Sequence, residues 1–269
     1  MSDGVEYKRL VDLPGLVLGT GRFKAFNFDR HYHLDYHVGL VTEGIQRQCV
    51  NGEAVLLGPG RISLMPPGEI HDGAGESGNA YTLKTFRLSR DLLQDVTTEV
   101  TDSAREPAPK AMMIENPTLA ARLLQLHDAM RSSPDASSLC VQSEWLSLLY
   151  CLFNQSGAIE PTAIKGTLSP VHRQRLEDYC LFHLAEKITL DELATLCGLG
   201  RFHFLRRFKQ TVGMTPHAWL LRLRLEQACT LLARGKPTIA DVAQGVGFYD
   251  QSHFNRAFRH AFGVAPSAY

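Results

Sequence analysis

The sequence predicts a two-domain protein, in which an all-β barrel of the jelly-roll type with two flanking helices precedes an all-α domain. Three observations lead to this fold class. The N-terminal half contains short β-rich segments divided by glycines. From Asn116 onward the apolar residues recur at helical spacing, and near the C-terminus one helix-turn-helix pattern occurs twice. We expect a first domain over residues 1–155, a linker over 156–169 and a second domain over 170–269.

The strands predicted in the N-terminal half are short and end at turn residues. Asn51-Gly52 lies between two of them and is a strong signal for a two-residue hairpin turn. Many short strands at regular spacing are typical of a barrel or jelly roll. The predicted strands lie within Val11–Phe28 and over Tyr36–Thr42, Gln46–Val50, Ala54–Leu57, Arg61–Met65 and Tyr81–Leu88.

Two apolar helices are predicted after the strands, over residues 116–132 and 138–154. Each carries large apolar residues at helical spacing, so we expect both helices to cover an open side of the barrel. His127 falls on the first helix and is predicted to be a surface histidine without a role. The linker over residues 156–169 follows, because that segment contains two glycines and a proline.

The C-terminal domain contains the same unit twice. The two copies align at an offset of 49 residues up to a glycine turn and at an offset of 50 residues after it. A repeat that keeps its helical residues and changes length at a turn is a duplicated supersecondary unit. The matched pairs are Ala194 with Ala243, Gly198 with Gly247, Arg206 with Arg256, Phe208 with Phe258, Lys209 with Arg259, Gly213 with Gly263 and Pro216 with Pro266.

Each copy has the pattern of a helix, a tight turn and a second helix. Thr189 and Thr238 are predicted to cap the first helices, each with an acidic residue three positions later that can return a bond to the cap. The second helix is expected over residues 201–212 in the first copy, and Asp250 caps it in the second copy. A helix-turn-helix sends its second helix into the major groove of DNA.

Two further helices are predicted in this domain. One over about residues 170–185 precedes the first copy. The other opens with Thr215 and Pro216 and ends near Arg234, before a glycine. Because this long helix joins the two copies, it is expected to fix the distance between their second helices.

The second helix of each copy carries side chains that suit DNA. Helical spacing predicts that Phe202, Arg206 and Lys209 share an outward face. Gln251 and Asn255 are predicted to do so with Arg256. Arginine suits the guanine edge, and asparagine or glutamine suits the adenine edge. The residues predicted to contact double-stranded DNA are Arg201, Phe202, Leu205, Arg206, Lys209, Gln251, Ser252, Asn255, Arg256 and Arg259.

Histidines form a second group, in the N-terminal half. His31 and His33 are followed by His37, and His71 comes later on another predicted segment. Residues two apart on a strand share a face, so we expect the first three and Asp35 to point the same way. With His71 from a neighbouring strand, the imidazoles could converge on a Zn, Fe, Ni or Cu ion. They could instead hydrogen-bond to an organic ligand or to backbone carbonyls.

Three runs of the second domain carry a family resemblance. Gly-Leu-Gly-Arg-x-x-Phe-x-Arg-x-Phe-Lys starts at Gly198, and Gly-Met-Thr-Pro starts at Gly213. Ile-Ala-Asp-Val-Ala-x-Gly-Val-Gly-Phe-Tyr-Asp-Gln-Ser-His-Phe-Asn-Arg-Ala-Phe-Arg starts at Ile239. With these runs the sequence resembles the AraC/XylS family of bacterial transcription regulators. The sequence departs from the family pattern at Gly200, where the family usually has serine, and at Phe204, where it usually has leucine.

The resemblance implies a function and partners. It implies a small-molecule effector bound in an N-terminal sensor domain, contact with RNA polymerase, usually activation, and a homodimer formed through the N-terminal domain. The histidine group also resembles the two cupin motifs, with His37 where cupins usually carry glutamate. Sensor domains of the family commonly keep such histidines without a metal. The resemblance therefore favours an effector pocket at His31, His33, His37 and His71, with a first-row transition metal as the alternative and no cofactor required.

The charge distribution agrees with a DNA-binding C-terminal domain. Residues 171–269 contain 13 Lys and Arg against 8 Asp and Glu, whereas the remainder contains 15 against 20. A basic module beside an acidic one is typical of a DNA-binding domain joined to a domain with another role.

Cysteine usage and the N-terminus indicate the compartment. The six cysteines show no paired spacing, the first residues lack an apolar signal region, and no run reaches membrane-spanning length. We therefore expect a cytoplasmic protein without a membrane partner. An enzyme is not expected, because a metal-dependent cupin enzyme has no need of two matched DNA-reading helices. A DNA-binding protein with a degenerate sensor is the other alternative.

Overall fold

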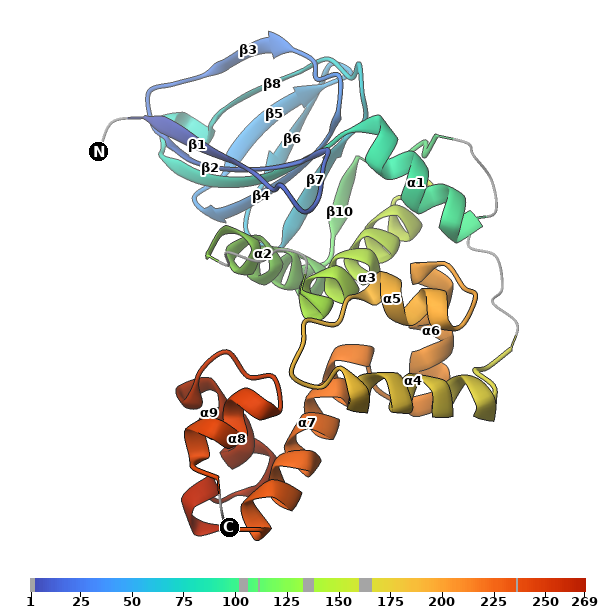
Figure 1. Cartoon of the computed structure of the whole chain (residues 1–269). Coiled ribbons are helices and arrows are strands. Elements are labelled where there is room, and N and C mark those ends of the chain that lie inside the picture. The colour runs from blue at the N-terminus through green and yellow to red at the C-terminus, as the bar shows by residue number, and fades with distance from the viewer. Residues whose placement is uncertain (1–2, 102–105, 111, 133–137, 160–165, 236) are drawn as a thin grey trace. The chain divides into compact units, whose positions relative to one another are not determined.

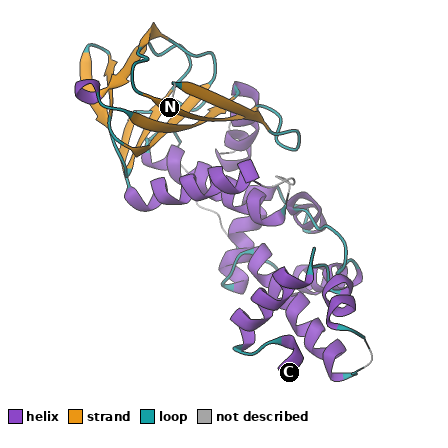
Figure 2. Ribbon diagram, turned by 90° about the vertical axis from the view of Figure 1, so that its left-hand side faces the viewer, coloured by secondary structure: helices purple, strands orange, loops and turns teal. Residues whose placement is uncertain are grey.

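The computed structural model describes residues 3–101, 106–110, 112–132, 138–159, 166–235 and 237–269. The chain divides into two compact units, Met1–Ser137 with Glu144–Ala163, and Ser138–Ser143 with Ile164–Tyr269. The first unit contains the strands, and the second is helical (Figure 1 and Figure 2). Residues 160–165 of the predicted linker lie outside the described residues.

The first unit is built on two antiparallel sheets. Six strands follow the order β1-β2-β9-β4-β7-β10, and four follow the order β3-β8-β5-β6. This arrangement confirms the β-rich fold predicted for the N-terminal half. The strands are β1 (Gly4–Arg9), β2 (Leu16–Phe23), β3 (Phe28–His31), β4 (Tyr36–Glu43), β5 (Gln46–Val50), β6 (Glu53–Leu57), β7 (Arg61–Met65), β8 (His71–Gly75), β9 (Tyr81–Leu88) and β10 (Met113–Glu115).

The hairpin between β5 and β6 has the predicted turn. Val50 pairs with Glu53, so Asn51 and Gly52 form the two-residue connection. Both turn residues have positive φ, at 53° and 83°. A type I′ turn requires this conformation at both central positions, and the Asn-Gly pair adopts it readily.

The central strands β2, β4 and β9 of the six-stranded sheet are largely buried, and the two faces of the sheet differ in chemistry. On one face, Leu18 and Phe86 are buried, and Phe86 stacks on Trp145 of helix α3 (Leu139–Gln155) at 5.8 Å between ring centroids. On the other face, His37 and Thr85 line a cavity between the sheets. Because side chains alternate along a strand, most of the cavity-lining residues of β2, β4 and β9 are at odd-numbered positions, and Thr20 is the exception among them.

Three helices lie between strand β9 and the second unit, namely α1 (Arg90–Thr101), α2 (Pro117–Ser132) and α3 (Leu139–Gln155). The first residues of α3, up to Ser143, are assigned to the second unit. The two predicted flanking helices are thus confirmed, and α2 packs against β7 and β9 of the six-stranded sheet. Helix α1 was not predicted. Its buried residues Leu93 and Val96 lie three positions apart on one helical face, so the amphipathic spacing was present in the sequence.

The prediction that His127 lies on the surface is wrong. Its side chain is fully buried, and Phe86 lies edge-on to its ring at 5.2 Å. His127 lies one residue after Leu126, and α2 turns both side chains toward the sheet. The helical face that contacts the sheet is therefore wider than the leucine spacing indicated.

The second unit contains the two predicted helix-turn-helix copies. Its helices are α4 (Pro170–Phe182), α5 (Leu190–Leu196), α6 (Arg201–Val212), α7 (Pro216–Ala233), α8 (Ile239–Gly245) and α9 (Gln251–Phe262). Thr189 and Thr238 form complete capping boxes with Glu192 and Asp241. Such boxes satisfy backbone N–H groups that the first helical turn leaves unpaired. Asp250 caps α9 by accepting a hydrogen bond from the backbone N–H of His253.

The long helix α7 contributes to the cores of both copies. Near its N-terminus, Trp219 lies edge-on to Phe208 of α6 at 5.6 Å. Farther along, Leu225 belongs to a buried cluster with Phe254 and Phe258 of α9. The second helices of the two copies, α6 and α9, are therefore packed on one continuous helix.

The turn of the second copy requires a glycine at position 247. Gly247 has φ of +82°, and a Cβ atom there would lie 2.3 Å from the carbonyl oxygen of Leu184. Arg224 of α7 donates hydrogen bonds to the same carbonyl and to that of Glu186, at 3.1 and 2.9 Å. These contacts join the loop after α4 to α7 and to the turn between α8 and α9.

Candidate functional site

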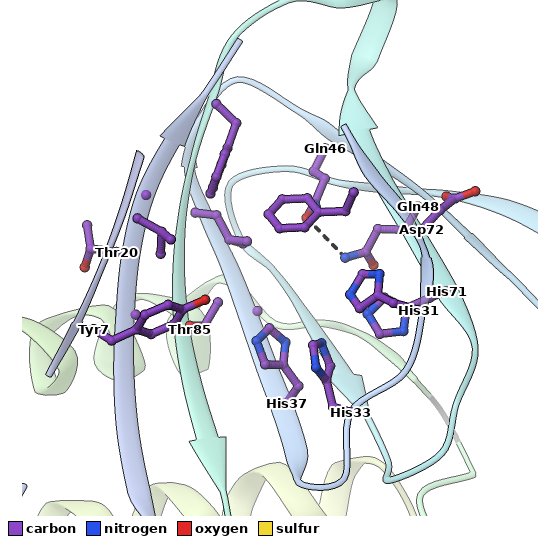
Figure 3. A pocket seen from close by; sticks show the side chains of 17 residues that line it. Tyr7, Thr20, His31, His33, His37, Gln46, Gln48, His71, Asp72 and Thr85 are labelled. Carbon is purple, nitrogen blue, oxygen red and sulfur yellow. Dashed lines mark hydrogen bonds between the residues drawn. The ribbon is translucent and has the colours of Figure 1, made fainter. Parts of the chain in front are cut away.

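A polar cavity of about 70 Å³ lies between the two sheets of the first unit (Figure 3). Its walls combine apolar residues such as Phe23 and Leu83 with four histidines. The histidines gather on one side of the cavity and come from β3, the following loop, β4 and β8. The polar lining residues are Tyr7, Thr20, His31, His33, His37, Gln46, Gln48, His71, Asp72 and Thr85.

Backbone pairing brings the histidines together. His31 at the end of β3 lies opposite His71 at the start of β8. The carbonyl oxygen of His33 accepts a hydrogen bond of 2.9 Å from the backbone N–H of Gly68. The loop after β3 is thereby fixed to the turn before β8, and this contact carries His33 toward His71.

The four predicted pocket histidines are therefore close in space, but the predicted reason is only partly right. Strand β3 ends at His31 and β4 begins at Tyr36, so a loop separates His31 from His37. Asp35, expected on the same face, instead pairs with Arg87 at 3.2 Å. One continuous strand was the wrong assumption, because the chain turns between residues 31 and 36.

Two hydrogen bonds orient two of the rings. Nδ1 of His31 lies 2.6 Å from the carbonyl oxygen of Asp29, and Nδ1 of His71 lies 3.0 Å from that of Glu69. A carbonyl oxygen can only accept, so each Nδ1 carries the proton and donates. In the neutral form of each ring, Nε2 is then unprotonated and keeps a free lone pair.

The rings form one compact cluster. Ligand nitrogens of His31, His33 and His71, one from each ring, all lie within 4.8 Å of one another. His37 stacks on His33, with ring centroids 4.4 Å apart and planes inclined by 25°. Three histidines thus converge, and the fourth packs against one of them.

Burial favours the neutral form of the rings of His33, His37 and His71. Burial, followed by the nearby imidazoles of His71 and His31, lowers the pKa of His33 to about 4. Burial is also the main reason why the pKa of His37 lies well below its ordinary value and why that of His71 is lowered. A neutral imidazole can accept a hydrogen bond or bind a metal ion without first losing a proton.

Two buried glutamines form another part of the cavity wall. Gln46 donates to the hydroxyl of Tyr81 at 3.2 Å. Gln48 donates to the side-chain oxygen of Gln46 at 3.1 Å (Figure 3). Ser63 in turn donates to Gln48 at 3.3 Å. Sequence reasoning missed both glutamines, although they alternate with exposed residues on a predicted strand. That alternation was the available signal for inward-facing polar residues.

On helix α6 the predicted DNA contacts divide into two groups. Arg206 and Lys209 are exposed, whereas Phe202 and Leu205 retain only 3% and 7% exposure. The prediction that Phe202 shares an outward face with Arg206 and Lys209 is therefore wrong. Phe202 lies in the first turn of α6, which packs against α5, and the guanidinium of Arg206 lies over its ring at 5.7 Å. Arg201, also in this turn, is partly buried.

On helix α9 four of the five predicted residues have the expected exposure. Gln251, Ser252, Arg256 and Arg259 are exposed, and Asn255 is partly buried. The side-chain oxygen of Asn255 is buried and has no hydrogen-bond partner among the described residues. Phe254 and Phe258 on the opposite face are fully buried. The helix therefore presents a polar and basic side while its apolar side holds it in the core.

The sequence matches two family descriptions that correspond to these parts. Residues 13–149 match the AraC-like ligand binding domain, and residues 193–269 match a helix-turn-helix domain. A β-sheet domain with an internal polar cavity, joined to a domain with two helix-turn-helix motifs, defines a ligand-responsive transcription regulator. The chain belongs to the AraC family of these regulators.

Curated relatives agree with this assignment. The chain is 32% identical to the HTH-type transcriptional regulator MtrA of Neisseria gonorrhoeae, over 86% of this chain and 85% of the relative. It is 27% identical to the uncharacterized HTH-type transcriptional regulator YbfI of Bacillus subtilis, over 89% and 86%. It is 23% identical to the HTH-type transcriptional activator RhaS of Klebsiella pneumoniae, over 89% and 86%. The similarity thus extends over both domains.

Among the helices of the described chain, none combines the length and the apolar composition needed to cross a membrane.

Proposed function

We propose that this AraC-family regulator is a transcription activator that binds a small-molecule effector in the cavity of its N-terminal domain. The observation that carries the proposal is the pairing of a polar internal cavity with two recognition helices that expose basic residues at matched positions. Arg206 corresponds to Arg256, and Lys209 corresponds to Arg259. A relative such as RhaS, described as an activator, supports the direction of regulation.

Helices α6 and α9 are proposed to enter successive segments of the major groove, about 34 Å or one helical turn apart. Arg206, Arg256, Gln251 and Asn255 are proposed to read base edges, because their side chains match guanine or adenine. Lys209 and Arg259, which are exposed at matched positions near the ends of α6 and α9, are proposed to position the domain on phosphates. Phe202 and Leu205 are left out of this contact set because they are buried.

The proposed protein partners are a second copy of the chain and RNA polymerase. We propose a cytoplasmic homodimer formed through the N-terminal domain, which contacts RNA polymerase once it is bound to its operator. DNA binding needs no cofactor in this scheme, and the chain has no catalytic role. The support is the family membership together with the regulatory descriptions of the relatives.

Selection of operators from randomised DNA with the full-length chain tests the proposal. Wild type should enrich a defined sequence, and Arg256→Ala should lose about 1–3 kcal/mol of binding to it. Arg173→Ala, which removes an exposed arginine of α4, is the matched control and should bind like wild type. A wild-type chain that enriches no sequence would contradict the proposal. A small-molecule melting screen of the same protein then identifies the effector by a rise in Tm.

A further inference from the structure

We propose that His31, His33 and His71 bind one divalent transition-metal ion, and that the effector reaches the pocket as a ligand of this ion. The inference rests on the proposed role of the cavity as the effector pocket. It adds the chemistry by which that pocket recognises its ligand.

The first argument is the convergence of donor atoms. One nitrogen from each of the three rings lies within 4.8 Å of the other two. Zn–N bonds of about 2.0–2.1 Å place tetrahedral ligand atoms roughly 3.4 Å apart. Small rotations about the side-chain torsions of His31 and His33, which are only partly buried, suffice to close this difference.

The second argument is the orientation of the rings. His31 and His71 each donate Nδ1–H to a backbone carbonyl, as described above. Metal-binding histidines almost always use their second nitrogen in this way, because the bond fixes the tautomer and makes the other nitrogen a better ligand. A cluster of histidines that served only to fill the core would not need two rings held in the same tautomer.

The third argument concerns the neighbours of the cluster. His37 stacks on His33 and holds the plane of that ring, so it acts as a positioning residue. Asp72 lines the same cavity and brings a carboxylate beside His71. Its oxygen accepts a hydrogen bond of 2.7 Å from the backbone N–H of Cys49, which fixes its position. A nearby negative charge favours a bound cation.

The ligand set indicates the kind of ion and the kind of effector. Imidazole suits Zn²⁺, Fe²⁺, Co²⁺, Ni²⁺ and Cu²⁺, whereas Mg²⁺ and Ca²⁺ prefer oxygen ligands. Three protein ligands leave a fourth position open for an external ligand. The three histidines line a cavity of about 70 Å³ together with Gln46 and Gln48, whose amide groups can hydrogen-bond to an oxygen ligand of the ion. The effector is therefore a compact molecule with an anionic oxygen, such as a small carboxylate.

Metal content and affinity test the ion. Untagged full-length protein is stripped with a chelator, loaded with Co²⁺ or Zn²⁺, and measured by elemental analysis and calorimetry. We expect one ion per chain, and a Kd weakened by about 100-fold or more in His31→Ala and in His33→Ala. His172→Ala in α4 removes a histidine outside the cluster and should bind metal like wild type. Circular dichroism melting verifies that each variant is folded.

Absorption of the Co²⁺-loaded protein tests the open position. Azide, used as a small anionic probe, should change the visible spectrum of wild type and leave that of His33→Ala unchanged. A wild-type spectrum that does not respond to azide would overturn the effector part of the inference.

The outcomes separate this inference from the proposed function. A folded wild type that binds no ion, or a His33→Ala variant that binds it as tightly, overturns the metal site, even if the protein still selects an operator. One ion per chain together with no operator selection supports the site and contradicts the proposed function instead.

Discussion

Nε2 of His127 lies 3.0 Å from the carbonyl oxygen of Gly19, which joins helix α2 to strand β2. Nε2 therefore carries the proton and donates, and Nδ1 is unprotonated. Nδ1 is buried and has no hydrogen-bond partner among the described residues. A second proton on this ring would place a charge in the core. Burial accordingly lowers the pKa of His127 from 6.5 to about 4.

The free energy of unfolding of the first unit should fall as the pH drops from about 6.5 to about 4. The unfolded chain binds a proton on His127 near pH 6.5, whereas the folded chain resists it until about pH 4, so unfolding takes up a proton in between. Lys84 and Arg131 oppose the charge and Asp128 favours it. Between pH 7 and pH 5 this residue should remove about 2 kcal/mol of stability.

His127→Gln isolates this contribution. Its amide can still donate to Gly19 but does not titrate, so the loss of stability between pH 7 and pH 5 should be smaller by about 2 kcal/mol. Urea unfolding of Trp219→Phe chains measures it, because Trp145, which stacks on Phe86 in the first unit, is then the remaining tryptophan. An equal pH dependence in both chains would show that His127 is not the titrating group.

The same position in the two repeats should respond differently to truncation. Phe202 is buried, whereas its counterpart Ser252 is exposed. Phe202→Ala should lower the free energy of unfolding by about 3–5 kcal/mol, as a core truncation does. Ser252→Ala should change it by under about 0.5 kcal/mol. Denaturant unfolding checks both, and similar values for the two variants would contradict the assignment.

Alanine substitutions at Arg256 and at Phe258 should have different effects on stability and on DNA binding. Arg256 is exposed, so Arg256→Ala should leave the Tm nearly unchanged while it alters the preferred operator. Phe258 is fully buried, so Phe258→Ala should destabilise the domain by about 3–5 kcal/mol and lose DNA binding as a consequence. Operator selection with Arg256→Ala, Gln251→Ala and Asn255→Ala completes the test. An unchanged preferred sequence in all three would mean that α9 does not read bases.

DNA binding should weaken steeply with salt. A phosphate contact releases a counterion, so log K falls linearly with log salt concentration. Lys209→Ala should weaken binding to all sequences alike and reduce the slope by about 1. Fluorescence anisotropy of a labelled operator at several salt concentrations measures this slope. Arg173→Ala should keep the wild-type slope, and a Lys209→Ala slope equal to it would exclude a phosphate contact.

A serine at position 200 should stabilise the first copy. Gly200 is the N-cap of α6 and supplies no side-chain bond, whereas Asp250 caps the matching helix α9. Its φ and ψ of −69° and 157° are those of an ordinary extended residue. Gly200→Ser should therefore raise stability by about 0.5 kcal/mol, through a new capping bond and a less flexible unfolded chain. A lowered Tm would show that the exposed cap has no room for the hydroxyl.

The sequence predicted the second unit more completely than the first. Thr189, Thr215, Thr238 and Asp250 cap helices as expected, because capping depends on neighbours within one turn. Several strands of the first unit, including β5, β7 and β9, also have their predicted bounds. Local turn chemistry and alternation were sufficient for these elements.

Features that depend on contacts with distant parts of the chain were harder to predict. Strands β1 and β10 were missed, and β3 and β8, which carry His31 and His71, were expected without bounds. These strands are short, polar or glycine-rich and are held by pairing with distant strands. His127 and Phe202 were assigned to the surface from helical spacing alone. Their burial depends on Gly19 of β2 and on the helix before α6, which no periodicity within their own helix reveals.

Helices α6 and α9 both pack on α7, and this arrangement restricts the spacing between the two DNA segments of the operator. Since α6 and α9 pack on one continuous helix, one residue inserted in α7 would rotate one of them against the other by about 100° and shift it by about 1.5 Å. Spacing and rotation are coupled in the DNA as well, because each added base pair turns the second segment by roughly 35° about the duplex axis. A single base pair inserted between the two segments should therefore abolish simultaneous binding, even though every contacted base is still present.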